Sequence, residues 1–241
     1  MNTPHHWNAD HLRLTFFSSS LWDIQIDSEF LGFFAAIAET VQTKPSAGQG
    51  KANGPWKDLL AEARVSTNRL DFLVQAAPTG DLEQDIISDP LGNLDLLIES
   101  GIRWAAEKET ITRIALGVGG LIESSSEEDS LSKIQDLVRF VHIDPTKHKE
   151  FQVRFNSPRE SESIASLQIN RLTTWSSVEV TIGLITPNGP SSTLKKKYYC
   201  GCNIDINTAT ENTTPFTKNQ GAALITELQK TAKEILANGV D

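Results

Sequence analysis

The chain has 241 residues and a formal net charge of −9, from 22 Lys and Arg against 31 Asp and Glu. Apolar residues make up 39% of the chain and charged residues 22%, which are ordinary proportions for a globular protein. This composition excludes collagen, a coiled coil, a disulfide scaffold and wholesale disorder. The length suits one large domain or two small ones.

The longest apolar run, Phe30–Ala38, is too short to cross a bilayer, because a spanning helix needs about 20 residues. The N-terminus has neither the basic segment nor the apolar segment of a secretory signal. Cys200 and Cys202 lie one residue apart, a spacing that rarely satisfies disulfide geometry. We therefore expect a soluble, cytoplasmic protein that does not contact a membrane.

The first part of the chain predicts a strand, a helix and a loop. Residues His11–Phe17 alternate between apolar and polar, as in a strand. The segment 44–55 contains two prolines and three glycines, and we expect a mobile surface loop there, followed by a short helix over Trp56–Leu60. Apolar residues at helical spacing predict one buried helix face made of Phe30, Phe33, Phe34, Ile37 and Val41.

The middle of the chain predicts strand, helix and strand in that order. Arg69–Ala77 and Ile111–Glu123 are strand-like, and Asp89-Pro90 is typical of a helix start. Gly117–Gly120 interrupt the second strand, which favours a bulge or a close backbone approach over a phosphate loop. The buried stripe of the helix between the strands is predicted to be Leu91, Leu94, Ile98, Ile102 and Ala105. Acidic residues at positions 127–129 begin a second helix.

The last part of the chain predicts strands and a final helix. The strands are expected over Phe151–Phe155, Leu167–Leu172, Ser177–Ile185 and Lys197–Asn207, with a turn at 187–190. Antiparallel pairing follows because the connections are too short for helical crossovers. An amphipathic helix over Lys218–Asn238 ends the chain.

These elements predict an α+β fold, with a mostly antiparallel sheet, helices packed on one face and a closing C-terminal helix. We treat residues 1–241 as a single domain. The alternative is a division into a mixed part, 1–145, and a part of antiparallel strands plus the C-terminal helix, 146–241.

A group of polar and aromatic side chains is predicted to form a binding surface, because pairing of 151–156 with 167–172 would place several of them on one sheet face. The group consists of Arg154, Asn156, Arg159, Asn170, Arg171 and Trp175. Our leading hypothesis is a non-enzymatic adaptor without a cofactor that recognises another macromolecule, namely a protein. Charge reversal at Arg154 or Arg171 is then expected to weaken binding with little effect on stability.

Two other hypotheses remain open. His142, Asp144 and His148 would serve as ligands in a metal-dependent hydrolase or nuclease. The lysines and tyrosines of Lys195–Tyr199 would bind nucleic acid through phosphate contacts and stacking, although the acidic net charge counts against this. The phenylalanine-rich segment 30–41 would also suit contact with a second subunit, so a homo-oligomer is a further alternative.

Overall fold

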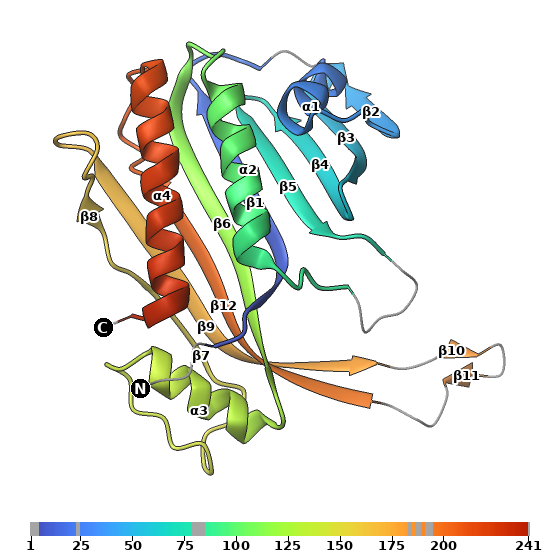
Figure 1. Cartoon of the computed structure of the whole chain (residues 1–241), viewed down its shortest axis with the longest axis vertical. Helices are drawn as coiled ribbons and strands as arrows, with labels where there is room; N and C mark the ends of the chain where they lie inside the picture. The colour runs from blue at the N-terminus through green and yellow to red at the C-terminus, as the bar shows by residue number, and fades with distance from the viewer. Residues whose placement is uncertain are drawn as a thin grey trace.

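The computed structural model describes residues 5–22, 25–78, 85–182, 185–186, 189–190 and 195–240, and the side chains of 182–195 lie outside this description. Within the described residues, four α-helices accompany an antiparallel sheet of ten strands (Figure 1). The helices are α1 (Ile26–Phe34), α2 (Pro90–Ala105), α3 (Glu127–Leu137) and α4 (Lys218–Asn238). The α+β fold predicted from the sequence is therefore confirmed.

The sheet order is not the chain order. From one edge to the other the strands are β2 (Thr40–Lys44), β3 (Gln49–Trp56), β4 (Leu59–Ser66), β5 (Arg69–Ala76), β1 (Asn8–Ser18), β6 (Ile111–Ser124), β12 (Lys195–Thr208), β9 (Gln168–Ile182) and β7 (Gln152–Asn156). The short β8 (Arg159–Glu160) also pairs with β9, and β10 (Ile185–Thr186) pairs with β11 (Gly189–Pro190). Segments 1–145 and 146–241 contribute to one sheet, because β6 pairs with β12.

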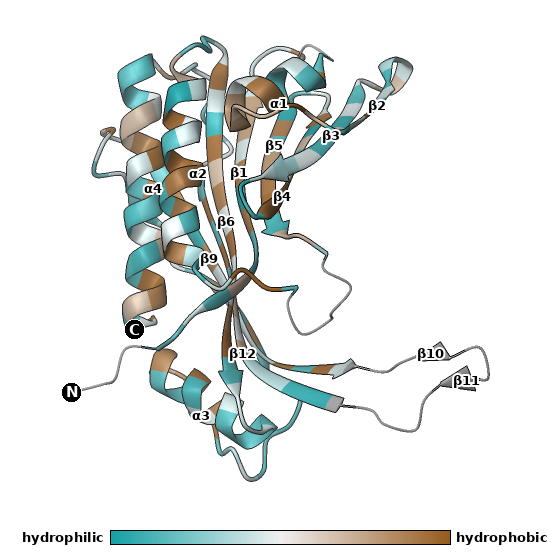
Figure 2. Cartoon of the chain, turned by 45° about the vertical axis from the view of Figure 1, so that its right-hand side comes forward, coloured by the Kyte–Doolittle hydropathy of each residue, from teal (hydrophilic) through white to brown (hydrophobic). Residues whose placement is uncertain are grey.

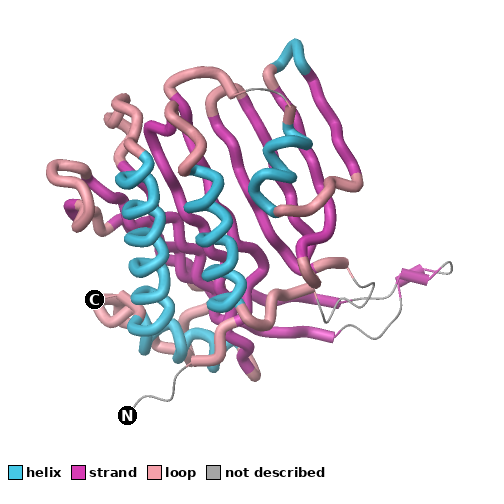
Figure 3. Tube along the Cα trace, turned by 45° about the horizontal axis from the view of Figure 1, so that its top comes forward, coloured by secondary structure: helices cyan, strands magenta, loops and turns pink. Residues whose placement is uncertain are grey.

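The helices lie on one face of the sheet, as Figure 3 shows. Alternate strand residues such as Leu70 and Phe72 are buried beneath them, which is visible as the apolar colouring under α1, α2 and α4 in Figure 2. The ring of Phe33 in α1 stacks on Phe72 at 3.7 Å between centroids, and Trp104 of α2 lies 5.1 Å from Phe72. We call the opposite face, which carries residues such as Arg69 and Asp71, the outer face.

Local sequence signals account for where two of the helices begin. The Asp89 carboxylate accepts a hydrogen bond of 3.0 Å from the backbone N–H of Gly92, so Asp89 is the predicted N-cap of α2. At α4, the side chains of Thr217 and Gln220 form a reciprocal capping box. The bounds of α4 match the predicted helix.

The predicted helix over 29–41 is shorter than its apolar spacing suggested. Phe30, Phe33 and Phe34 are buried as expected, but α1 ends at Phe34 because Ala35 adopts a left-handed conformation with φ of 52°. Ile37 is then 81% exposed, and Val41 lies in the edge strand β2. The prediction for these last two residues was wrong, because helical spacing alone does not mark the residue at which a helix stops.

The segment 44–55 is not a mobile loop but a short 3-10 turn (Pro45–Ala47) followed by strand β3, and Trp56–Leu60 forms a hairpin instead of a helix. The glycines permit close packing. A Cβ atom on Gly54 would lie 3.0 Å from the backbone oxygen of Ile37, and one on Gly50 would lie 3.3 Å from Ile26 Cγ2. Glycine content indicated flexibility in the sequence, whereas here it lets α1 and its loop approach the strand.

The strands β9 and β6 differ in detail from the strands predicted there. The predicted strands 167–172 and 177–185 form one strand, β9, paired with β12 as far as Ile182. In β6, Gly117–Gly120 lie inside a continuous strand opposite a bulge in β1, and Trp7 packs on Gly120. Of the two predicted explanations, a bulge is present, and the groups that approach the glycines closely are side chains. Of the predicted turn at 187–190, Pro187 and Asn188 lie outside the described residues.

None of the described helices combines the length and the apolar character needed to span a bilayer.

The two faces of α2 provide a test of this packing. Leu94 is fully buried, whereas Leu91, predicted to share the same stripe, is 40% exposed. Leu94→Ala is expected to lower the free energy of unfolding by about 2–5 kcal/mol, because it leaves a cavity in the core. Leu91→Ala is the matched control and should change it by about 0.5 kcal/mol. Urea denaturation followed by tryptophan fluorescence measures both, and equal losses would contradict the observed orientation of α2.

Candidate anion-binding site on the outer face of the sheet

Three residues of the predicted binding surface lie together on the outer face. Asn156 of β7 donates a hydrogen bond from Nδ2 to Oδ1 of Asn170 in β9, at 3.0 Å. Asn170 in turn donates to Asn207 of β12 at 3.2 Å, and Asn207 donates to Asp205 at 2.9 Å. Arg154 is exposed on the same face of β7. This end of the outer face is therefore lined by hydrogen-bonded amides with one arginine beside them.

The other three residues lie on the helix side, so the expected single surface is corrected to two sets of three. Trp175 is fully buried, with its ring edge-on to Trp7 at 6.4 Å. Arg171 lines a pocket beside α4, and Arg159 donates a hydrogen bond to Thr231 of α4. The reason is strand alternation, because Arg171 and Trp175 are odd-numbered residues of β9 and Asn170 is even-numbered.

The structure gives no support to the metal hypothesis. The Asp144 carboxylate accepts hydrogen bonds from the backbone and hydroxyl of Thr146, and His148 Nδ1 accepts one from the backbone N–H of Asp144. These contacts hold the pKa of Asp144 at about 2, with Thr146 and Lys147 as the main causes. His142 is exposed, and among the described residues no group of three potential ligands is placed to hold a metal ion.

The stretch Lys195–Tyr199 does not present one basic and aromatic surface. It begins β12, so Lys196 and Tyr198 face one side of the sheet while Lys197 and Tyr199 face the other. Lys196 forms an ion pair of 2.7 Å with Glu179, and Tyr199 is buried. The side chain of Lys195 lies outside the described residues.

A denser set of cations lies at the other end of the outer face. The strand register aligns outer-face residues in rows that run across the strands from β2 to β6. One row reads Lys44, Gln49, Ser66, Arg69, Phe17 and Arg113. The adjacent row reads Gln42, Lys51, Arg64, Asp71 and Thr15. We call the five cations of these rows, Lys44, Lys51, Arg64, Arg69 and Arg113, the basic rows.

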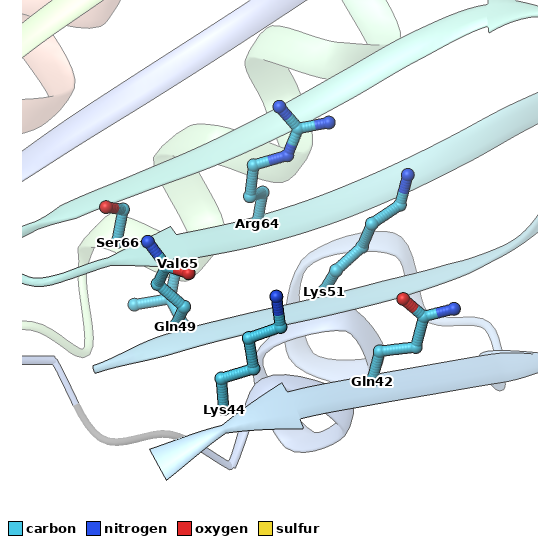
Figure 4. A pocket seen from close by; sticks show the side chains of 8 residues that line it. Gln42, Lys44, Gln49, Lys51, Arg64, Val65 and Ser66 are labelled. Atoms are coloured by element: carbon cyan, nitrogen blue, oxygen red, sulfur yellow. The ribbon is translucent and has the colours of Figure 1, made fainter. Parts of the chain in front are cut away.

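A pocket of about 260 Å³ opens among the basic rows over β2, β3 and β4. Lys44, Lys51 and Arg64 project from the three neighbouring strands in the same direction, beside the side-chain amides of Gln42 and Gln49 (Figure 4). Because neighbouring strands lie about 4.8 Å apart, these side chains converge on one volume. Lysine, arginine and amide groups all donate hydrogen bonds, so the lining suits an anion.

The acids near the basic rows are less exposed than the cations they bind. Glu62 accepts ion pairs from Lys51 at 2.6 Å and from Arg64 at 2.5 Å. Its side chain is 11% exposed, compared with 38% for Lys51 and 56% for Arg64. Glu62 lies in the next row of the same face, so it orients the two cations from the side and leaves part of each in solvent. Lys44 has no ion-pair partner within the described residues.

An aromatic ring lies between the last two cations of the first row. The guanidinium carbon of Arg113 is 4.4 Å from the centroid of Phe17, and that of Arg69 is 5.8 Å from it. Arg69 also binds Asp71, with 2.8 Å between Nε and Oδ2, and Asp71 is held in turn by the Thr15 hydroxyl at 2.6 Å. Burial lowers the pKa of Arg113, an effect opposed by Glu211 and Asp205. These contacts fix both guanidinium groups, which favours binding of a carboxylate or phosphate.

The basic rows were not predicted from the sequence, because Lys44 and Lys51 were assigned to a loop and no strand was expected at Arg64. Arg69 and Arg113 do lie in predicted strands, but the pairing of those strands was unknown. The sequence did contain one signal for strand β4. Between 59 and 66 the buried residues Leu59, Ala61, Ala63 and Val65 alternate with more polar positions that include Arg64, which is a strand pattern. Nothing in the sequence indicated that strand β4 lies beside the strands that carry Lys44 and Lys51.

The two cysteines provide a test of the burial of the helix side of β12. Both are buried on the helix side of β12, and burial raises the pKa of Cys200 to about 12 and that of Cys202 well above its usual value. Because only the thiolate is reactive, both thiols should resist iodoacetamide at neutral pH in the folded protein and react after unfolding. Mass spectrometry counts the modified sites. Rapid labelling of either cysteine before unfolding would contradict its burial.

Arg171 lines a pocket beside α4, whereas Arg154 is exposed on the outer face, and stability measurements should distinguish the two positions. Arg171→Glu places a carboxylate in the pocket that Glu234 also lines, so it should lower the free energy of unfolding by about 1–3 kcal/mol. Arg154→Glu, on the exposed outer face, should change it by about 0.5 kcal/mol. This replaces the expectation that reversal at Arg171 leaves stability unchanged. Urea denaturation measures both variants, and a neutral Arg171→Glu would refute the packing against α4.

A scan of the chain against models of known protein families gives no match. A search of curated proteins also finds no sequence relative.

Proposed function

We propose that the protein is a non-catalytic binding protein, and that the basic rows recognise an acidic segment of another protein. The observation that supports this is the gathering of five cations on two adjacent rows of the outer face, in a chain whose net charge is −9. The acids that pair with Lys51, Arg64 and Arg69 are Glu62 and Asp71, which are largely covered, at 11% and 14% exposure. Asp205 and the exposed Glu211 lie near Arg113 only, so the outward surface over β2 to β5 is locally basic.

Local charge favours a short acidic segment over nucleic acid. An extended polyphosphate would lie across more of the outer face than the basic rows cover, and it would meet Asp205 and Asp10 beyond them. A peptide with a few carboxylates fits within the rows, where arginine offers bidentate geometry and lysine a point charge.

The lining of the pocket suits binding more than catalysis. Its polar groups are two lysines, one arginine, two glutamines and one serine. These groups bind and orient an anion, and Glu62, the carboxylate nearest to them in the described residues, is engaged by two cations. This chemistry supports the adaptor hypothesis over the hydrolase hypothesis.

The proposal predicts salt-sensitive binding of an acidic probe. A fluorescently labelled polyglutamate peptide should bind the full chain at low ionic strength, and the double variant Lys44→Glu with Arg64→Gln should weaken binding by about tenfold. In that variant Glu62 keeps Lys51 as its partner. Fluorescence anisotropy measures the affinity.

The control is Lys218→Glu, which changes the net charge by −2, against −3 in the double variant, at an exposed lysine in the first turn of α4. It should bind the peptide as the unaltered chain does. Equal weakening in both variants would reduce the effect to net charge and refute the surface. Tighter binding of an oligonucleotide than of the peptide, lost in the double variant, would assign the basic rows to nucleic acid instead.

A further inference from the structure

The strand β2 ends the sheet beside the basic rows with one edge unpaired. It pairs with β3 from Thr40 to Lys44, and no other described strand lies on its second side. All five of its residues are exposed. The backbone N–H and C=O groups of such an edge are free to accept another strand, which is how several domains bind extended peptides.

The two faces of β2 differ in chemistry. On the outer face, Gln42 and Lys44 line the pocket together with Lys51 and Arg64. On the helix side, Val41 is 47% exposed, and the preceding loop carries Ile37 at 81% exposure. A strand placed alongside β2 would therefore meet cations on one face and apolar side chains on the other, because its own side chains alternate between the faces.

We propose that the acidic segment binds by adding a strand to the free edge of β2, and that its sequence alternates acidic and apolar residues. This inference rests on the proposed function and specifies its ligand. Carboxylates at alternate positions would lie beside Lys44 and Gln42, within the cross-strand distance of about 5 Å. The intervening apolar residues would cover Val41, and backbone hydrogen bonds would supply affinity that does not depend on charge.

Charge complementarity favours this occupant over a second copy of the chain. Pairing of two β2 strands would join two outer faces into one and bring two sets of basic rows together, with Lys44, Lys51 and Arg64 repeated on both sides of the junction. Like charges at that spacing are unfavourable. An acidic strand neutralises the same cations.

The test uses a short peptide of alternating glutamate and valine with two N-methylated forms, one methylated at every glutamate and the other at every valine. In an extended strand the N–H groups of alternate residues point to opposite edges, so each form blocks one edge only. Anisotropy titration against the full chain should show one form weakened by about tenfold or more, and the other within about threefold of the parent peptide.

A variant of the chain tests the apolar side. Val41→Lys should weaken the parent peptide by about tenfold, because it removes the apolar contact. The control Val180→Lys makes the same change at a valine of β9 that is 41% exposed, and it should leave affinity unchanged. Both sites are exposed, so neither variant is expected to affect folding.

The outcomes separate the two proposals. If both N-methylated forms bind like the parent while Lys44→Glu with Arg64→Gln still weakens them, strand addition is refuted and the proposed function stands. If the parent peptide does not bind while the polyglutamate peptide does, strand addition is refuted and the proposed function stands; if neither peptide binds, both proposals fail. A concentration-dependent dimer in sedimentation velocity that Val41→Lys dissociates would assign the edge to a second copy and overturn the inference.

Discussion

Burial of one face of the sheet beneath the helices is the constraint on which the rest of the structure depends. The stack of Phe33 on Phe72, with Trp104 against it, joins α1 and α2 to the strands they cover. Because side chains alternate along a strand, packing of one set against the helices sends every intervening residue to the outer face. The outer face is thus a consequence of the core, which decides which polar residues meet there, and their ion pairs and hydrogen bonds then hold them in place.

The same constraint explains how an acidic chain acquires a locally basic surface. Register across β2 to β6 is set by the buried residues, since a shift by one position would turn the apolar set toward solvent. That register brings cations from separate strands into adjacent rows. Glu62 and Asp71 then bind some of these cations from less exposed positions, which offsets repulsion between neighbours and leaves the positive groups outermost.

Features that depend on residues close together in the chain were predicted from the sequence, whereas features that depend on distant residues were not. The N-cap of α2, the bounds of α4 and the long strand β6 all have local signals, and each was predicted close to what is observed. The region 44–60 was assigned wrongly because its glycines accommodate α1, a contact that composition does not reveal. Trp175 and Arg171 were placed with Asn170 because residue type was weighed more than strand alternation.

By itself, the sequence determined the α+β class, the starts of α2, α3 and α4, and the alternation that divides strand residues between two faces, because these depend on neighbours in the chain. Only the tertiary structure decided which strands lie side by side, and hence which cations meet. Backbone hydrogen bonds between strands are chemically alike for any pair of partners, so the order β2-β3-β4-β5-β1-β6 follows from how all the apolar faces are buried together. The basic rows and the free edge of β2 are products of that arrangement.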